Sequence, residues 1–169
     1  MSNFAKLAPF DAKGRVRMVV ETPRGSSTKF KFDEELQSFT VSRTLAMGIA
    51  YPFDWGFVPS TRSADGDAVD ALCIHYQPSF PGVVLPCRCL AVVDVDQQSK
   101  SGRVGNPRVI LAPAWEGSKA FASTELSERA MAEIETFFLN ATLFTDKDAR
   151  IIGWRGSEAA EQLIRECAL

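Results

Sequence analysis

The sequence is poor in the residues from which zinc sites are built. It has one histidine, His75, and four cysteines, at positions 73, 87, 89 and 167. A zinc site would need several histidines or a second pair of cysteines besides Cys87 and Cys89. Those two side chains are two residues apart and share one face of a strand. We therefore expect reduced thiols in or near the core, and no zinc site.

Long apolar runs, an excess of positive charge and a leader segment are also missing. The longest apolar stretches, at 83–85 and 90–93, are far shorter than a membrane span. The first six residues lack the charged, apolar and small-residue regions of a signal peptide. A net charge of −2 and a pI near 5.5 differ from the basic character of nucleic-acid-binding domains. We expect a cytoplasmic protein that binds neither membranes nor nucleic acid.

What is present fits one globular domain over residues 1–169, with 46% apolar and 24% charged residues. No internal repeat or long linker divides the chain. Most of the sequence up to residue 113 has the pattern of short strands separated by turn residues. The predicted strands cover residues 15–22, 29–32, 39–42, 69–76, 83–96 and 108–112.

Helical spacing appears only towards the C-terminus. Apolar residues recur every three or four positions over 130–141, and Ser127 precedes them as an expected cap. Short strands followed by two helices predict a mainly β protein with flanking helices (α+β), built as a small closed or partly closed barrel. The second helix, with Ser157 as its expected cap, has an apolar stripe of Ala160, Leu163, Ile164 and Cys167.

Three carboxylates lie within six residues of one turn, at Asp65, Asp67 and Asp70. Their mutual repulsion favours a bound cation, and oxygen ligands suit Mg²⁺, Mn²⁺ or Ca²⁺. Solvated acids in an ordinary Asp-Gly turn are the alternative. An EF-hand is excluded, because its sixth position requires glycine and is Asp70, and its twelfth requires glutamate and is Tyr76. The turn predicts a divalent-metal site for a phosphate-type substrate.

Charged residues elsewhere are candidates to complete this site. Lys29 and Lys31 lie two apart on one predicted strand and Arg43 ends the next, and such cations bind phosphate oxygens. Asp94 and Asp96 follow the long apolar strand and are candidates for further metal ligands. The alternative for both groups is a role as solvated charges at sheet edges.

Taken together, these segments resemble the soluble inorganic pyrophosphatases of family I. The matching segments follow one another along nearly the whole chain, which is more specific than any single motif. They are 19–30 (VVETPRGSSTKF), Arg43, 51–57 (YPFDWGF), 65–72 (DGDAVDAL) and 80–82 (FPG), with weaker matches at 111–113, 137–138 and 153–154.

The resemblance implies an OB-like five-stranded β-barrel with two C-terminal helices. It also implies a homo-oligomer, which is a hexamer in bacterial members. The implied activity is hydrolysis of inorganic pyrophosphate, or a related phosphoanhydride, by a metal-activated water, with Mg²⁺ as cofactor and Mn²⁺ as the alternative. By position, the metal ligands are Asp65, Asp70 and, through water, Glu21; the catalytic residue is Asp67; and the substrate-binding residues are Lys29, Arg43 and Trp55.

The chain departs from the family pattern inside the expected site. Acids are replaced by a lysine and two amides, and amides bind Mg²⁺ without contributing charge. Two alternatives therefore stay open: a non-catalytic binding or regulatory protein of this fold, and a hydrolase of a larger phosphoanhydride contacted by Trp55 and the loop 99–107. The substituted positions are Lys31, Trp55, Ala68, Gln97, Asn106, Ala141 and Thr142.

Neighbouring residues are candidates to compensate for these losses. Asp96 would stand in for the acid missing at Gln97 if the loop 99–107 shifted the strand register, although a one-residue slip would turn it to the other face. Lys100 and Arg103 are candidates for the missing cations.

Overall fold

A computed structural model describes residues 4–77, 79–120 and 125–169. Short 3₁₀ turns cover Phe4–Lys6 and Ser118–Ala120. The helices are α1 (Glu128–Asn140) and α2 (Ser157–Cys167). The strands are β1 (Val16–Thr22), β2 (Thr28–Asp33), β3 (Ser38–Thr44), β4 (Asp54–Phe57), β5 (Asp70–Cys73), β6 (Val84–Ser99), β7 (Gly102–Gly105), β8 (Arg108–Pro113) and β9 (Arg150–Gly156).

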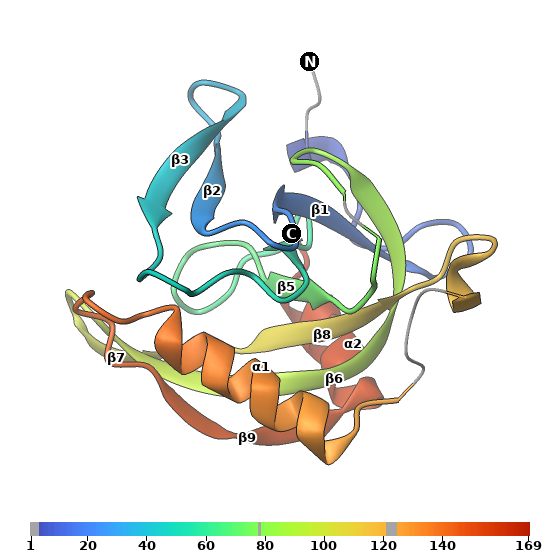
Figure 1. Ribbon diagram of the computed structural model, residues 1–169. Helices are drawn as coiled ribbons and strands as arrows, with labels where there is room; N and C mark the ends of the chain where they lie inside the picture. Colours follow the sequence, from blue (N-terminus) through green and yellow to red (C-terminus); the bar gives the residue numbers. More distant parts are fainter. Residues whose placement is uncertain (1–3, 78, 121–124) are drawn as a thin grey trace.

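Five strands close into a ring. β1 pairs with β4, β4 with β5, β5 with β8, β8 with β6, and β6 returns to β1. Every pair is antiparallel except β5 and β8, which run parallel and place Asp70 opposite Arg108. The predicted five-stranded barrel is therefore confirmed. β7 and β9 pair with the C-terminal part of β6 and extend the sheet beyond the ring (Figure 1).

β1, β5 and β8 are buried on both faces of the sheet, and each face has its own helix. Alternate residues of β5 separate into two clusters: Ala71 and Cys73 pack in the cluster that contains α2, whereas Leu72 packs in the cluster that contains α1. Figure 1 shows α1 in front of the barrel and α2 behind it. The apolar residues predicted for both helices supply these contacts, so the two C-terminal helices are confirmed.

The β2–β3 hairpin forms a separate two-stranded sheet beside the barrel (Figure 1). Phe4 connects it to the barrel, because the centre of the Phe4 ring lies 5.0 Å from that of Phe32 on β2 and 6.2 Å from that of Phe57 on β4. Lys29 pairs with Arg43 across the hairpin, and a bulge follows between Lys29 and Phe30. The hairpin therefore places Lys29 and Arg43 beside the barrel, on strands that do not belong to it.

Several local predictions need correction. The segment expected as a loop at 99–107 contains β7, because residues 102–105 pair back onto the end of β6. β4 and β9 were not expected, and the strand predicted over 69–76 is limited to Asp70–Cys73. Ser127 caps α1 by accepting from the Ala130 N–H at 3.1 Å, but α2 begins at Ser157 itself, after Gly156.

The four cysteines are free thiols, as expected: three are buried and Cys167 is half-buried. Within the described ranges, no helix combines the length and apolar character needed to cross a bilayer.

Candidate active site

The acidic turn is held by its own backbone. The Ser63 N–H donates to the Asp67 carbonyl at 2.7 Å, and the Gly66 N–H donates to the Ser63 carbonyl at 3.0 Å. Gly66 has a φ of 91°, a left-handed conformation that glycine adopts without a Cβ clash. The Asp65 carboxylate accepts from the Asp67 N–H at 3.1 Å. These contacts place the turn directly before β5, which begins at Asp70.

The carboxylates of this region lie close enough to disfavour one another's ionisation. Burial raises the pKa of Asp65, and the negative charges of Asp70 and Asp67 raise it further. Glu21, at the end of β1, is 6% exposed, and burial together with Asp70 raises its pKa to about 7. The Phe32 N–H donates to Glu21 at 2.8 Å and opposes that rise. This mutual repulsion is typical of carboxylates arranged around a cation.

The hairpin brings two predicted cations to these acids. The Lys31 ammonium donates to the Asp67 carboxylate at 2.9 Å, in a pair whose two side chains are half-exposed or more. Lys29 lies deeper, and burial lowers its pKa while attraction to Asp70 raises it. The carboxylate predicted to activate water is thus paired with the lysine that replaces an expected acid.

Two further cations were not recognised as site residues from the sequence. Arg108, the first residue of β8, is 6% exposed, and its pKa is lowered by burial and raised by Asp70. Lys147, between α1 and β9, has its pKa lowered by burial and raised by Asp70. The Lys147 carbonyl accepts from the Gln98 N–H at 2.6 Å, which ties this segment to β6. The sequence feature that could have identified Arg108 as a site residue is its position as a charged residue at the start of an otherwise apolar predicted strand.

Aromatic rings form the base of the site. The Arg108 guanidinium lies 4.4 Å from the centre of the Phe138 ring and 5.4 Å from that of Trp55. The Lys29 ammonium lies 5.8 Å from the Trp55 ring. Trp55 is 4% exposed, so it touches these cations from inside the core. Such cation–π contacts favour a charged group that has lost part of its hydration.

Arg43 and the residues near α1 complete one side of the site. The Arg43 guanidinium donates to the Ala141 carbonyl at 2.5 Å. Ala141 is buried and Thr142 half-buried, and these two substituted positions bring neither an aromatic ring nor a charge to this side of the site. Arg43 is oriented by the backbone at the end of α1.

The second acidic cluster is directed elsewhere, which corrects its prediction as a source of metal ligands. The two carboxylate oxygens of Asp94 accept from Arg155 at 2.6 and 2.7 Å. Asp96 accepts from Arg103 at 2.8 Å, so neither residue replaces a missing charge of the site. A bulge between Asp94 and Val95 shifts the register of β6 against β9. Both acids serve as ion-paired charges of the sheet.

Gln97 and Asn106 are amides at two positions where the family resemblance predicts acids. Asn106 is 4% exposed, and its side-chain amide donates to the Asp70 carboxylate at 3.2 Å. Gln97 is 6% exposed, and its side-chain oxygen has no hydrogen-bond partner among the described residues. The acids that remain at the site are Glu21, Asp65, Asp67 and Asp70.

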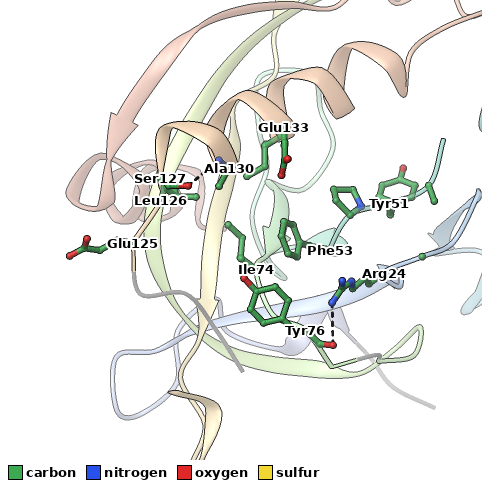
Figure 2. Close-up of a pocket in the computed structure, with 14 residues that line it drawn as sticks. Arg24, Tyr51, Phe53, Ile74, Tyr76, Glu125, Leu126, Ser127, Ala130 and Glu133 are labelled. Atoms are coloured by element: carbon green, nitrogen blue, oxygen red, sulfur yellow. Dashed lines mark hydrogen bonds between the residues drawn. The ribbon is translucent and has the colours of Figure 1, made fainter. Parts of the chain in front are cut away.

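A separate pocket of about 590 Å³ lies between the start of α1 and the aromatic segment before β4 (Figure 2). Figure 2 shows Arg24 beside Phe53 and Tyr76, and its guanidinium lies 5.5 Å from the centre of the Tyr76 ring. Tyr51 also lines this pocket, whereas none of the four site carboxylates does. The pocket is therefore separate from the carboxylates and cations described above.

The carboxylates of the site are oxygen donors of the kind that Mg²⁺ prefers. In the part of the chain that the structure describes, no three or more acidic, histidine or cysteine side chains are placed to share one metal. Asp65 and Asp70 nevertheless act on each other electrostatically. Mg²⁺ often takes one or two carboxylates and completes its shell with water and substrate phosphate. Asp65 and Asp70 therefore fit a single ion.

Replacing Glu21 by glutamine should stabilise the metal-free protein by roughly 3 kcal/mol at pH 8 and by less than about 1 kcal/mol at pH 5. Because the pKa of Glu21 rises from 4.5 to about 7 on folding, the folded state retains this proton longer than the unfolded state. Stability is therefore lost as the pH rises from 4.5 to 7. Glutamine removes that loss and keeps an acceptor for the Phe32 N–H. Urea unfolding in EDTA at both pH values measures the difference.

The matched control for that experiment is Glu35→Gln, which neutralises an exposed glutamate in the β2–β3 hairpin. It should change stability little at either pH. A stabilisation by Glu21→Gln of equal size at pH 5 and pH 8 would show that ionisation of Glu21 is not its cause.

Comparison with known proteins gives a consistent result. The family model for inorganic pyrophosphatase matches residues 18–169. The inorganic pyrophosphatase of Aeropyrum pernix is 33% identical over 169 residues, covering 98% of this chain and 95% of the relative. That of a Synechocystis strain is 30% identical over 156 residues, covering 91% and 90%.

Solved structures agree with the sequence relatives. The crystal structure of inorganic pyrophosphatase from Thermus thermophilus superposes with a TM-score of 0.87 at 31% identity, covering 98% of this chain and 97% of the other. An inorganic pyrophosphatase from Neisseria gonorrhoeae gives 0.86 at 26% identity, covering 98% and 96%. The likeness thus includes both the barrel and the segments that carry the acidic turn.

Proposed function

Because this chain belongs to the inorganic pyrophosphatase family, we propose that it hydrolyses inorganic pyrophosphate to orthophosphate. The observation that carries this proposal is the acidic turn at the start of β5, where Asp65, Asp67 and Asp70 lie beside the cations of the hairpin and of β8. Acids for a metal and a water, with cations for a phosphate, are the two parts that phosphoryl transfer to water requires.

The metal in this proposal is Mg²⁺, with Mn²⁺ as the alternative. Asp65 and Asp70 would hold it directly and Glu21 through water. When bound, such an ion supplies a more acidic water and neutralises charge on the phosphoryl oxygens. The hard oxygen donors and the electrostatic coupling between Asp65 and Asp70 support this choice.

In the proposed reaction, Asp67 accepts a proton from the attacking water. The water oxygen bonds to one phosphorus, the bridging P–O bond breaks, and the second phosphate leaves with the electron pair. Lys29 and Arg43 bind the phosphate oxygens and offset the negative charge of the leaving group. The Trp55 ring contacts Lys29 and Arg108 and so helps to position these two cations for the substrate.

Lys31 competes with water for the Asp67 carboxylate, which it contacts through Oδ2 alone. The pair is accessible to solvent, with 50% of the Lys31 side chain and 63% of the Asp67 side chain exposed. Exposed ion pairs of this kind contribute only about 0–1 kcal/mol. The Lys31–Asp67 pair is therefore a resting contact that bound substrate can exchange.

We further infer a cytoplasmic homo-oligomer, a hexamer by family resemblance. Large apolar side chains are exposed along α1 and the chain that follows it, including Leu139, Leu143 and Phe144, and Ile152 is exposed on β9. Exposed apolar residues in one region favour contact with another copy of the chain. Size-exclusion chromatography with light scattering measures the assembly.

Release of orthophosphate from pyrophosphate tests the proposed activity directly. Purified protein is incubated with pyrophosphate and Mg²⁺, with Mn²⁺, or with EDTA. We expect two orthophosphates per pyrophosphate with either metal and almost none with EDTA. Faster release from a nucleoside diphosphate would instead indicate a larger phosphoanhydride as substrate, and no release from either substrate would indicate a non-catalytic protein of this fold.

A further inference from the structure

Arg103, on the short strand β7, joins two parts of the chain that are far apart in the sequence. Its Nε donates to the Asp96 carboxylate on β6 at 2.8 Å, and its Nη1 donates to the Asp148 carboxylate at 2.7 Å. Its Nη2 donates to the backbone carbonyl of Asp96 at 3.2 Å and to that of Asp148 at 2.9 Å. One guanidinium thus links β6 to the chain just before β9, which lies beside β7 in Figure 1.

Asp148 has a backbone conformation that needs support from its surroundings. Its φ is 39°, in the left-handed region that residues with a side chain rarely adopt. It lies in the irregular chain between α1 and β9. Arg103 bonds to both its carboxylate and its carbonyl, and Arg150 donates to the carboxylate at 2.9 Å. Strained residues persist where several contacts fix them, and they are frequent at functional sites.

The residue directly before Asp148 is Lys147, whose ammonium acts at the acidic site. Asp70 attracts this ammonium, whereas Arg108 and Arg43 repel it. Its position therefore reflects a balance between one attraction and several repulsions. A cation under such repulsion stays in place only if its backbone is held.

The β6–β7 hairpin holds that backbone at two neighbouring points. The Gln98 N–H on β6 donates to the Lys147 carbonyl at 2.6 Å. Gln98 is paired with Arg103 across the hairpin, and Arg103 holds Asp148. Two adjacent residues of the hairpin ladder thus fix two adjacent residues of the irregular chain.

We propose that Arg103 is a positioning residue of the candidate active site: by fixing the left-handed backbone at Asp148, it holds the Lys147 ammonium beside Asp70. For its effect on catalysis, the inference rests on the proposed function. The contact is strong in both directions, because the hydrogen bond from Arg103 lowers the pKa of Asp148, and Asp96 and Asp148 raise the pKa of Arg103. Networks of this kind contribute more than isolated exposed ion pairs.

A double-mutant cycle on Mg²⁺-dependent pyrophosphate hydrolysis tests whether Arg103 acts through Lys147. We expect Lys147→Gln to raise KM roughly tenfold, as for one lost charged contact, and Arg103→Gln to raise it roughly threefold. When both are replaced, Arg103→Gln should add nothing to the effect of Lys147→Gln, because the group through which it acts is absent. A merely structural role would change KM by the same factor in both backgrounds.

Arg155→Gln is the matched control for Arg103→Gln. Arg155 also pairs with an acid of β6, donating to the two oxygens of Asp94 at 2.6 and 2.7 Å, and it is also partly exposed. It lies near the end of β9, whereas Lys147 precedes the start of that strand. Its replacement should change KM by less than about twofold. Melting curves show that each variant is folded.

Hydrogen exchange followed by mass spectrometry tests the same placement without catalysis. Peptides that contain Gln98 report on the N–H that donates to the Lys147 carbonyl. We expect Arg103→Gln to speed the exchange of this amide roughly tenfold, because the chain that carries its acceptor is loosened. Arg155→Gln should leave it unchanged.

The two experiments separate this inference from the proposed function. If the unmodified protein does not hydrolyse pyrophosphate, the proposed function is wrong, and the exchange of the Gln98 amide alone decides on Arg103. Faster exchange in Arg103→Gln, with no added effect on KM in the Lys147→Gln background, supports the proposal. Unchanged exchange, or an effect of Arg103→Gln on KM that persists in full without the Lys147 ammonium, overturns it.

Discussion

Replacing Asp67 by asparagine is expected to lower the rate of Mg²⁺-dependent pyrophosphate hydrolysis roughly 10²–10⁴-fold, the usual contribution of a general base. Asparagine has nearly the same shape and keeps an oxygen that can accept from the Lys31 ammonium. It cannot take a proton from water. The variant therefore removes one chemical property and leaves the turn intact. Phosphate release measures kcat, and thermal melting checks that stability is unchanged.

Asp94→Asn is the matched control for this experiment. Asp94 is an acid of the second cluster, and both its oxygens are paired with Arg155 away from the acidic turn. Its replacement should alter kcat by less than about twofold, since a solvated ion pair contributes little. If Asp94→Asn slowed hydrolysis as much as Asp67→Asn, both the role of Asp67 and the placement of the second cluster would be wrong.

The fold was predictable where local patterns are long and regular. The apolar stripe of α1, with Ser127 before it, fixed both the position of that helix and its buried face. β4 is four residues long and lies in an aromatic segment without strand-like alternation, and β7 is a short polar strand. Such strands form because neighbouring strands provide hydrogen-bond partners, and the local sequence gives no sign of those partners.

The candidate site was predictable only where its residues are close in the sequence. Asp65, Asp67 and Asp70 lie in one turn, so their spacing alone indicated a shared role. Arg108 meets Asp70 only because β5 and β8 pair in parallel, with a register set by distant packing. Lys147 arrives through a loop after α1, again by tertiary structure.

The metal-binding role predicted for Asp94 and Asp96 was wrong for the same reason, because tertiary contacts decide it. Asp94 and Asp96 have a composition suited to metal binding, but bulges in β6 and the approach of Arg155 and Arg103 decide their partners. A sequence pattern specifies which side chains are available. The pairing of distant strands decides which charges face one another.

Replacing Asp70 by asparagine should destabilise the metal-free protein by about 3 kcal/mol, because it removes the shared counter-ion of one buried and two half-buried cations. Asp70 attracts Lys29, Arg108 and Lys147, and these cations repel one another. Breaking a buried pair from one side leaves the other charge uncompensated, which costs more than the intact pair contributes. For a chain of this size, the loss corresponds to a fall in melting temperature of roughly 6–12 °C.

Thermal and urea unfolding in EDTA measure this loss, with Asp65→Asn as the control. Asp65 interacts with Lys147 and Arg108 but is not a counter-ion of Lys29 in the way that Asp70 is, and asparagine preserves the acceptor for the Asp67 N–H. Its replacement should cost less than about 1 kcal/mol. Excess phosphate should restore part of the stability lost in Asp70→Asn, because a bound anion supplies the missing negative charge. Equal losses in the two variants would mean that Asp70 is not the charge that holds these cations together.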